Sequence, residues 1–458
     1  MDEKKDFKEF DQKLTRRRFL KRALGGAAAG TTLLLAPRLP LFAGGKKEEK
    51  PEEVKEAAGP VTLDFVVWEY SVDTIQDNIK MFENKHPDIS VKLTGYTWPG
   101  YHDTLVLRFK GKTKTDVLYC GEDWLPEWAA AGWLAPIEDY FSEINQYKDK
   151  IVNYALQDMT YNGKLYGLPY YADLITFQFN RQILEKNNIS APADWDQVLD
   201  ACLKLKKDAG MDKPFIYEFN QTLPNFLHAF ISQVYGRGGE FIDKDLNPVF
   251  ARPGSETAKH LQWLQDANKK HKIMAHSPHE TKVNTAMQTG QHAMTVMYNY
   301  MLAAMNRPPS TIAGQCDMEL MPGKAHGCLG FCKFYTMTSQ AIKEGRGKAA
   351  WTFIEAFGGG DYSVAKRWAV EKGLGFGQLP LFDAPDVIEA WGTWIDMEKF
   401  KKQAKLAKTG PNYEWTGIWS EFFRPLLAKG MIGEASVSEV LEQGAEKWDE
   451  LKGLLLGE

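Results

Sequence analysis

Strand and helix patterns alternate over residues 61–119, and this order constrains the fold more than any other feature of the chain. The first segment, VTLDFVVW, is rich in β-branched and aromatic residues, and the next carries apolar side chains at helical spacing. The predicted elements are, in order, strand 61–68, helix 73–85, strand 89–93, helix 102–110 and strand 116–119. A β-α-β-α-β order predicts a parallel sheet with helices packed on its faces.

The rest of the chain continues with the same two kinds of pattern. A turn and a strand are predicted over 161–169, and further strands are predicted over 170–180, 215–219, 292–297 and 329–338. Helices are predicted over 194–209, 224–235, 255–271, 281–289, 347–358, 414–429 and 436–453. Because no repeat with a period of 20–50 residues is present, solenoids and propellers are excluded, and we predict an α/β protein.

The size and charge of the chain narrow the class further. The 458 residues suggest two or three domains, and 44% hydrophobic with 12% aromatic residues is ample for packed cores. The formal net charge is −4, which gives no sign of the clustered basic face that a phosphate backbone would require. We therefore exclude nucleic acid as a partner.

The N-terminus differs from the rest of the chain. Residues 15–21, TRRRFLK, precede a Gly- and Ala-rich run at 23–36, and together they resemble a twin-arginine export signal. An amphipathic or anchoring helix is the alternative, but 14 residues fall short of the roughly 20 that span a bilayer. We predict a signal peptide at 1–43, a charged linker at 44–60, and a mature protein in the periplasm or on the extracellular face of the membrane.

Aromatic and acidic residues stand directly after two of the predicted strands. Trp68 and Glu69 stand at the end of the first strand, and Glu122, Asp123 and Trp124 follow the strand at 116–119. Ligands of open α/β sheets bind beyond the carboxyl ends of the strands, so these residues are expected to border a cleft. Such residues suit a neutral polyol, because aromatic rings stack on sugar faces and carboxylates accept hydrogen bonds from hydroxyl groups. The polyol could be held for binding alone, or for cleavage of a glycosidic bond between two acids.

Six segments, taken in order, resemble the sugar-binding group of extracellular solute-binding proteins that serve ABC importers, similar to the maltose- and multiple-sugar-binding proteins. The segments are FENKHPDISV at 82–91, the region 116–140 with AAAGWLAPIEDY, YNGKLYGLP at 161–169, FNRQIL at 179–184, TAMQTGQHAMT at 285–295 and AAWTFIEAF at 349–357. Each segment alone is weakly specific, but their common order is more so. The resemblance covers residues 61–453.

The resemblance implies a two-lobed periplasmic-binding-protein type II fold with a ligand cleft between the lobes. It places the N-terminal lobe at 61–172 plus 331–385, the C-terminal lobe at 176–330 plus 386–458, and hinge crossings near 172–176, 330 and 380–386. Several short crossings imply a hinge that opens and closes on the ligand.

The resemblance also implies a set of ligand-binding residues. They are Trp68, Glu69, Glu122, Asp123, Trp124, Tyr171, Asp173, Tyr298, Asn299, Tyr300 and Trp415. Asp123 is favoured over Glu122 as the acceptor for sugar hydroxyls, and Tyr300 is the expected stacking ring. Core packing is the alternative for Trp68, and helix capping is the alternative for the acids.

Trp415 has a close alternative in Trp419, which lies four residues further along a predicted helix. This spacing puts both rings on one face, so one of the two is expected in the core.

The implied function is an extracytoplasmic binding protein that is not an enzyme and uses no cofactor or metal. Its predicted partners are a sugar or other polyol and the membrane permease subunits of an ABC transporter, and the protein itself is predicted to be a monomer. The alternative is an exported carbohydrate-active enzyme, similar to a glycoside hydrolase, that uses the same acidic and aromatic cleft.

The five cysteines fit neither a disulfide framework nor a clear metal site. Cys328 and Cys332 cannot pair within one strand, because four strand residues span about 13 Å and a disulfide allows about 6 Å. Cys316 with Cys328 is the better pair. A metal site formed by these three cysteines and His326 lacks the tight CxxC pairs of structural zinc.

A second cluster, formed by His271, His276, His279 and Glu280, lacks the HExxH spacing of a catalytic zinc site, so we expect these residues to be ordinary surface side chains.

Overall fold

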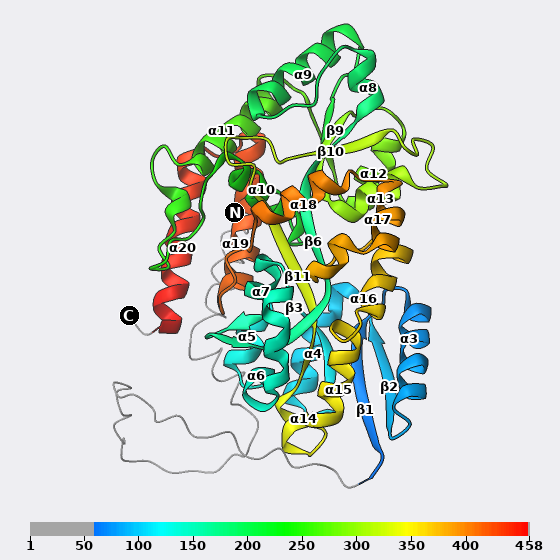
Figure 1. Cartoon of the computed structure of the whole chain (residues 1–458). Coiled ribbons are helices and arrows are strands. Elements are labelled where there is room, and N and C mark those ends of the chain that lie inside the picture. The colour runs from blue at the N-terminus through cyan, green and yellow to red at the C-terminus, as the bar shows by residue number, and fades with distance from the viewer. Residues whose placement is uncertain (1–58, 457–458) are drawn as a thin grey trace, which may run out of the picture.

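The computed structural model describes residues 59–456 (Figure 1). The predicted signal peptide at 1–43 and nearly all of the linker at 44–60 lie outside the described residues. Within 59–456, every helix is too short or too polar to cross a membrane.

One curved sheet of ten strands runs through both halves of the molecule (Figure 1). Its main path is β2-β1-β3-β11-β6-β9-β7-β8, while β10 pairs with β6 and β12 pairs with β11. The strands are β1 Val61–Trp68, β2 Ile89–Tyr96, β3 Val117–Gly121, β6 Gly167–Asn180, β7 Phe215–Glu218, β8 Met274–Ser277, β9 Met294–Tyr298, β10 Cys316–Glu319, β11 Cys328–Met337 and β12 Ala407–Lys408. A separate hairpin joins β4 Thr160–Tyr161 to β5 Lys164–Leu165.

The sheet is parallel at its two ends and antiparallel in the middle. The group β2-β1-β3 is parallel, as is β9-β7-β8, whereas β11 and β6 run antiparallel to each other and to β3 and β9. The parallel sheet predicted from residues 61–119 is therefore confirmed for β2-β1-β3, while the centre of the sheet is antiparallel because β11 joins it from late in the chain.

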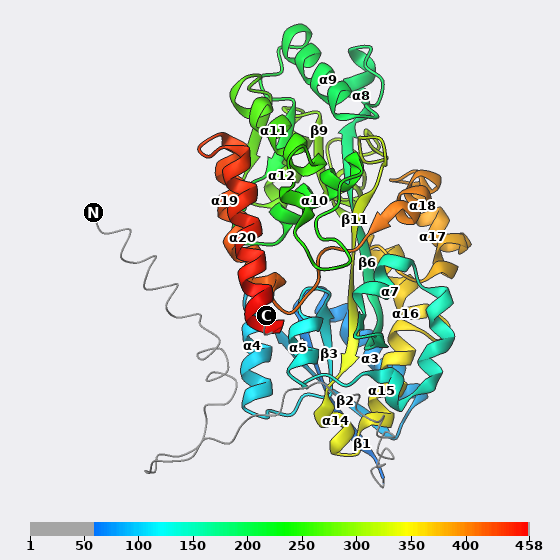
Figure 2. The same ribbon diagram turned by 90° about the vertical axis from the view of Figure 1, so that its left-hand side faces the viewer.

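Helices cover both parallel groups (Figures 1 and 2). They are α3 Val72–Lys85, α4 Trp98–Lys110, α5 Leu125–Ala130, α6 Ile137–Tyr140, α7 Asn153–Asp158, α8 Arg181–Lys186, α9 Trp195–Asp208, α10 Asn225–Arg237, α11 Glu256–Lys269, α12 Glu280–Gln288, α13 Asn299–Asn306, α14 Ser339–Lys343, α15 Gly347–Gly358, α16 Ser363–Arg367, α17 Pro385–Gly392, α18 Met397–Leu406, α19 Thr416–Ile432 and α20 Val437–Leu456. Short helical turns span Ser142–Lys150, Val249–Ala251, Trp368–Lys372 and Leu379–Asp383.

The lobe drawn lowest in Figure 1, here called the lower lobe, is built around β2-β1-β3. The ring centre of Phe65 in β1 lies 4.9 Å from that of Phe353 in α15, and the ring centre of Phe353 lies 5.1 Å from that of Phe82 in α3. The helical spacing of Ile75, Ile79 and Phe82 that predicted α3 thus turns one apolar face onto the core, where all three are buried.

The lobe drawn highest in Figure 1, the upper lobe, is built around β9-β7-β8 with α8 to α13. Its long helix α9 begins at Asp194, whose carboxylate accepts the backbone N–H groups of Asp196 and Gln197. The C-terminal helices α19 and α20 pack against each other, with the rings of Trp419 and Trp448 5.3 Å apart.

Two long strands pass from one lobe to the other. Residues 167–174 of β6 pair with β11, and residues 175–179 pair with β9 of the upper lobe. At its other end β11 pairs with β3 of the lower lobe. The predicted crossings near 172–176 and 330 fall on these two strands, while the lobe boundaries themselves stay a prediction.

All five cysteines are free and buried, so the predicted Cys316–Cys328 pair is wrong. Cys316 lies on β10, where its backbone N–H donates to Asn306, and its strand pairs with the far end of β6. Cys328 begins β11 beside β12 and Gln403. The sequence distance between the two cysteines is short, but their strands belong to different parts of the sheet.

Candidate ligand-binding pocket

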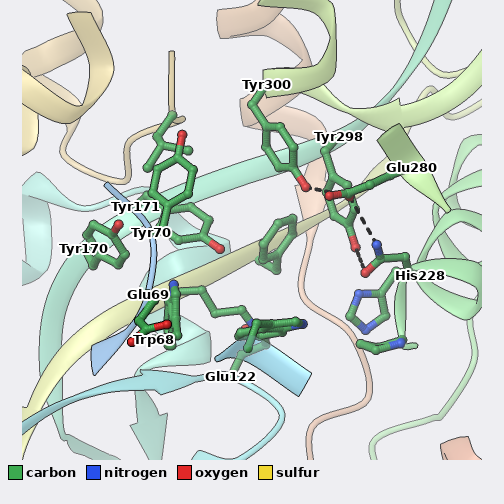
Figure 3. Close-up of a pocket in the computed structure, with 16 residues that line it drawn as sticks. Trp68, Glu69, Tyr70, Glu122, Tyr170, Tyr171, His228, Glu280, Tyr298 and Tyr300 are labelled. Carbon is green, nitrogen blue, oxygen red and sulfur yellow. Dashed lines mark hydrogen bonds and ion pairs between the residues drawn. The ribbon is translucent and has the colours of Figure 1, made fainter. Parts of the chain in front are cut away.

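A pocket of about 290 Å³ lies between the two lobes, where strand ends of both meet the crossing strands (Figure 3). Its lining is aromatic and acidic: Trp68, Glu69, Tyr70, Trp98, Glu122, Tyr170, Tyr171, Pro224, Asn225, His228, Glu280, Tyr298, Tyr300, Phe331, Lys333 and Leu374. This volume lies near the lower end of the usual range for small-molecule sites, about 300–1,000 Å³.

The lower wall comes from the ends of β1 and β3. Trp68 ends β1 and is largely buried, with its ring 4.6 Å from Tyr119 and 5.2 Å from Trp98. It therefore packs in the core and lines the pocket as well. Glu69 follows at an exposed position, and Glu122 directly follows β3.

A buried ion-pair cluster stands in this lower wall. The Lys333 ammonium, which β11 carries to the pocket, lies 2.8 Å from Glu122 Oε2 and 3.3 Å from Asp123 Oδ1. The side chains of Lys333 and Glu122 are 7% and 4% exposed. The ammonium also lies 5.4 Å from the Trp124 ring centre and 5.6 Å from that of Trp98, within cation–π range.

The charges of this cluster follow from its burial. Burial raises the pKa of Glu122 to about 7, against the opposing effect of the nearby ammonium. Burial also disfavours the charged form of Lys333, but Asp123 and Glu122 outweigh it and raise the pKa of the ammonium. Lys333 is therefore a permanent cation that compensates the acids beside it.

The upper wall is a hydrogen-bonded network of four side chains (Figure 3). The hydroxyl of Tyr300 donates to Glu280 Oε2 at 2.8 Å, and the hydroxyl of Tyr298 donates to Asn225 Oδ1 at 2.7 Å. Asn225 Nδ2 donates in turn to Glu280 Oε2 at 3.2 Å. The two tyrosine rings are stacked with centres 5.2 Å apart and an interplanar angle of 6°. The network holds both rings in a defined orientation.

His228 of α10 adds a neutral ring to the pocket. Its ring centre lies 6.4 Å from that of Phe331, and burial lowers the pKa of its imidazole to about 4. At neutral pH it is therefore uncharged and cannot serve as a cation for a ligand.

The structure brings six of the eleven predicted site residues into the pocket lining: Trp68, Glu69, Glu122, Tyr171, Tyr298 and Tyr300. Asp123 and Trp124 are not among the lining residues. Asp123 contacts Lys333, and the Trp124 ring packs 5.7 Å from Tyr101 and 5.3 Å from Trp98. Glu122 thus lines the pocket, whereas Asp123, the acid favoured from the sequence, does not.

Asp173 and Asn299 support the crossing strand β6 and do not line the pocket. Asp173 Oδ1 accepts the backbone N–H of Gly375 at 2.7 Å, and Asn299 Oδ1 accepts that of Leu174 at 2.7 Å. Both side chains are fully buried, and burial raises the pKa of Asp173 to about 7. Asp173 lies on the strand where a lobe crossing was predicted, and Asn299 directly follows strand β9, but both side chains accept hydrogen bonds from backbone N–H groups.

Trp415 also lies away from the pocket, in the core. It is 1% exposed, and its ring stacks on Tyr413 at 5.3 Å and lies 5.5 Å from Trp448. Trp419 is fully buried too, because the four-residue spacing turns both rings toward α20. One of these two tryptophans was expected in the core, and both lie there.

Ten lining residues were not predicted: Tyr70, Trp98, Tyr170, Pro224, Asn225, His228, Glu280, Phe331, Lys333 and Leu374. Lys333 could have been singled out from the sequence, because it is the one charged residue of the strand CLGFCKFYTM. Glu280 was considered only in a metal cluster. Among residues 59–456, no group of three or more His, Cys, Asp and Glu side chains is arranged to hold a metal ion.

Residues 68–313, more than half of the chain, match the family of bacterial extracellular solute-binding proteins. A putative binding protein of Brucella abortus is 26% identical over 403 residues, which cover 86% of this chain and 93% of that protein. The multiple sugar-binding protein of Streptococcus mutans is 25% identical over 200 residues, 43% of each chain.

The fold is similar to that of solved two-lobed binding proteins. The maltose-bound MalE3 of T. maritima superposes with a TM-score of 0.73 at 18% identity, covering 85% of this chain and 99% of that chain. An ABC transporter solute-binding protein of Thermotoga lettingae bound with α-D-tagatose gives 0.71 at 21% identity, with coverage of 85% and 99%. The predicted type II fold is thereby confirmed, and the chain belongs to the family of bacterial extracellular solute-binding proteins.

Proposed function

We propose that this protein binds a sugar or another polyol in the pocket between its lobes and delivers it to the permease of an ABC importer. The observation that carries the proposal is the composition of the pocket, where stacked aromatic rings stand beside carboxylates with no arginine in the lining. Aromatic rings pack on the C–H faces of a pyranose, and carboxylates accept hydrogen bonds from its hydroxyl groups. The names of the Streptococcus mutans relative and the two solved structures support the same ligand class.

We propose that the ligand closes the cleft by contacting both walls at once. The lower wall carries Glu122 and Lys333, and the upper wall carries Glu280 and Tyr300. A ligand that contacts both walls binds the closed form more tightly than the open form, and this difference drives closure. The permease would then recognise the distance between lobes, with the lobe division at 61–172 plus 331–385 and 176–330 plus 386–458.

An exported glycoside hydrolase is the alternative. Such an enzyme needs two carboxyl groups placed across one scissile bond. Here Glu122 and Asp123 share one ammonium ion, which supports a binding role for the pair. Labelled oligosaccharides incubated with the purified protein should be recovered intact, and shorter products would establish the enzyme.

A thermal-shift screen against a carbohydrate panel tests the proposed function directly. A ligand at about 100 times its dissociation constant adds about 2.7 kcal/mol to the free energy of unfolding. We expect at least one neutral sugar or polyol to raise Tm in a concentration-dependent manner. A panel of mono-, di- and trisaccharides and alditols without any such response would contradict the proposal.

Replacing Tyr300 with Ala should weaken the binding of that ligand by about 1.5–3 kcal/mol. The substitution removes a ring of the stacked pair and the hydroxyl that holds Glu280. Tyr300→Phe is the matched control, because it keeps the ring and loses only the hydroxyl. Calorimetry should rank the affinities wild type, then Tyr300→Phe, then Tyr300→Ala. Wild-type affinity in Tyr300→Ala would place the ligand elsewhere.

Export should depend on the arginine pair in residues 15–21. Replacing Arg16 and Arg17 together by Lys should leave folded precursor in the cytoplasm, because the twin-arginine route requires the pair. Arg18→Lys, at the variable position of the motif, should be exported normally. Cell fractionation with immunoblotting measures both, and normal export of the double variant would contradict this route.

A further inference from the structure

The charges that line the pocket are strongly unequal. Three lining residues are acidic, Glu69, Glu122 and Glu280, and Lys333 is the one Lys or Arg among the lining residues described. Its ammonium is already engaged by two carboxylates, at 2.8 and 3.3 Å. His228 is neutral at pH 7 because burial lowers its pKa to about 4. The pocket therefore holds no uncompensated positive charge for a ligand.

Glu280 is the one of these acids that stands in the upper wall. Its Oε2 accepts from both Tyr300 and Asn225, whereas its other oxygen has no hydrogen bond within residues 59–456. No described Lys or Arg forms an ion pair with it, and burial raises the pKa of its carboxyl against the opposing effects of Tyr300 and His279. The two donors fix the orientation of the carboxylate, so its second oxygen is a prepositioned acceptor at the pocket wall (Figure 3).

A second carboxylate lies behind this wall and reinforces its negative potential. Glu218 at the end of β7 accepts from Asn225 Nδ2 at 3.4 Å and is almost fully buried. Burial, and then the charge of Glu280, raise the pKa of Glu218 to about 7. Two carboxylates thus share one amide donor and form no ion pair with a described Lys or Arg. His279, the preceding residue, is the basic group near Glu280, and its effect of lowering the Glu280 pKa is smaller than the effect of burial.

We infer that Glu280 is the ligand acceptor of the upper wall, and that the pocket selects uncharged polyols over their carboxylate-bearing counterparts. This inference rests on the proposed function and specifies its ligand class. A carboxylate can only accept, so it requires a hydroxyl donor on the ligand. A uronate in the same place would bring its own negative charge between Glu280 and the Glu122–Asp123 pair. Repulsion between like charges within one pocket would oppose its binding.

The role of Glu280 also predicts a signature in the ligand-free protein. A buried carboxylate without a cation costs stability in the empty pocket, and a glutamine of the same shape keeps the acceptor for Tyr300 without the charge. Its raised pKa means that this cost grows as the pH rises above the ordinary value for Glu. Glu280→Gln should therefore raise the Tm of the empty protein at pH 8. If Glu280 instead stabilised the fold, the same substitution would lower the Tm.

The test uses the full mature protein and matched pairs of probes. The pairs are D-glucose with D-glucuronate, D-galactose with D-galacturonate, and maltose with its C6-oxidised form. Wild type, Glu280→Gln and the control Glu185→Gln are compared by calorimetry and thermal shift. Glu185 is exposed on α8 of the same lobe, so its substitution removes the same charge away from the pocket.

We expect wild type to bind the neutral member of a pair at least about 100-fold more tightly than the acid. Glu280→Gln should weaken neutral binding about tenfold, because a charge-assisted hydrogen bond becomes a neutral one, and Glu185→Gln should bind as wild type does. Uronates that bind as tightly as neutral sugars, unchanged affinity in Glu280→Gln, or a lower Tm in the empty variant would each overturn the inference while sugar binding stands. A panel in which neither member of any pair binds would contradict both.

Discussion

Lys333→Met is expected to lower the free energy of unfolding by about 3–5 kcal/mol at pH 8. The Lys333 side chain is 7% exposed, and its ammonium is the counter-ion for the buried carboxylate of Glu122. Removing one partner of a buried ion pair leaves the other charge without compensation, and this costs much more than the intact pair contributes. Methionine keeps most of the side-chain volume, so the loss of stability arises from the uncompensated charge and only slightly from a cavity.

The pH dependence of this loss distinguishes charge from packing. The pKa of Glu122 is already raised to about 7 by burial, and loss of the ammonium raises it further. A raised carboxyl pKa means that the penalty is present at high pH and disappears as protonation neutralises the group. Urea denaturation should therefore show a larger deficit at pH 8 than at pH 5.

Two further variants serve as controls for Lys333→Met. Adding Glu122→Gln to it should recover part of the loss, because it removes the uncompensated charge. Lys366→Met removes one partner of the ion pair with Asp386, whose side chains are 36% and 52% exposed, and should cost less than about 1 kcal/mol. A deficit independent of pH, or one as small as that of Lys366→Met, would contradict the assignment of Lys333 as the buried counter-ion.

Gly375→Ala should destabilise the protein by about 3 kcal/mol. A Cβ at this position would overlap the carbonyl oxygen of Ala172 and the Asp173 carboxylate. The backbone of β6 cannot move aside, because Ala172 and Asp173 pair with Cys332 and Phe331 of β11. Gly375 also donates its N–H to Asp173. The substitution therefore strains β6, a strand that passes from one lobe to the other.

Gly417→Ala is the matched control for Gly375→Ala. Gly417 is exposed in the first turn of α19, and a Cβ there meets no atom within 4 Å. Alanine should gain about 0.5–1 kcal/mol from helix propensity. Urea denaturation measures both variants. Equal stability of Gly375→Ala and wild type would show that the contact between residue 375 and β6 is not a constraint of the fold.

Local patterns made most of the secondary structure predictable. Helix α15 was predicted at its observed bounds of 347–358, because its apolar residues repeat at the helical period and face the sheet. The ends of β1 and β3 were predictable as well, and they brought Trp68, Glu69 and Glu122 to the pocket. Such features depend on neighbouring residues alone.

The remaining features of the site depend on contacts distant in the sequence. Lys333 contacts Asp123 across 210 positions, through an antiparallel pairing of β11 with β3 that no local pattern indicates. Asp173 was predicted at the hinge, but the direction of its side chain depends on Gly375, 202 positions away. Trp415 has the composition of a stacking residue, and only the packing of α20 decides that it is buried.

We expect a neutral carbohydrate to bind between the two walls of this pocket. A crystal structure of the protein with the strongest neutral ligand from the thermal-shift screen tests it most directly. We expect the ligand between the Tyr298–Tyr300 pair and the Glu122–Lys333 pair, with a ligand hydroxyl donating to Glu280. Density for that ligand outside this pocket, or contacts to one lobe alone, would contradict it.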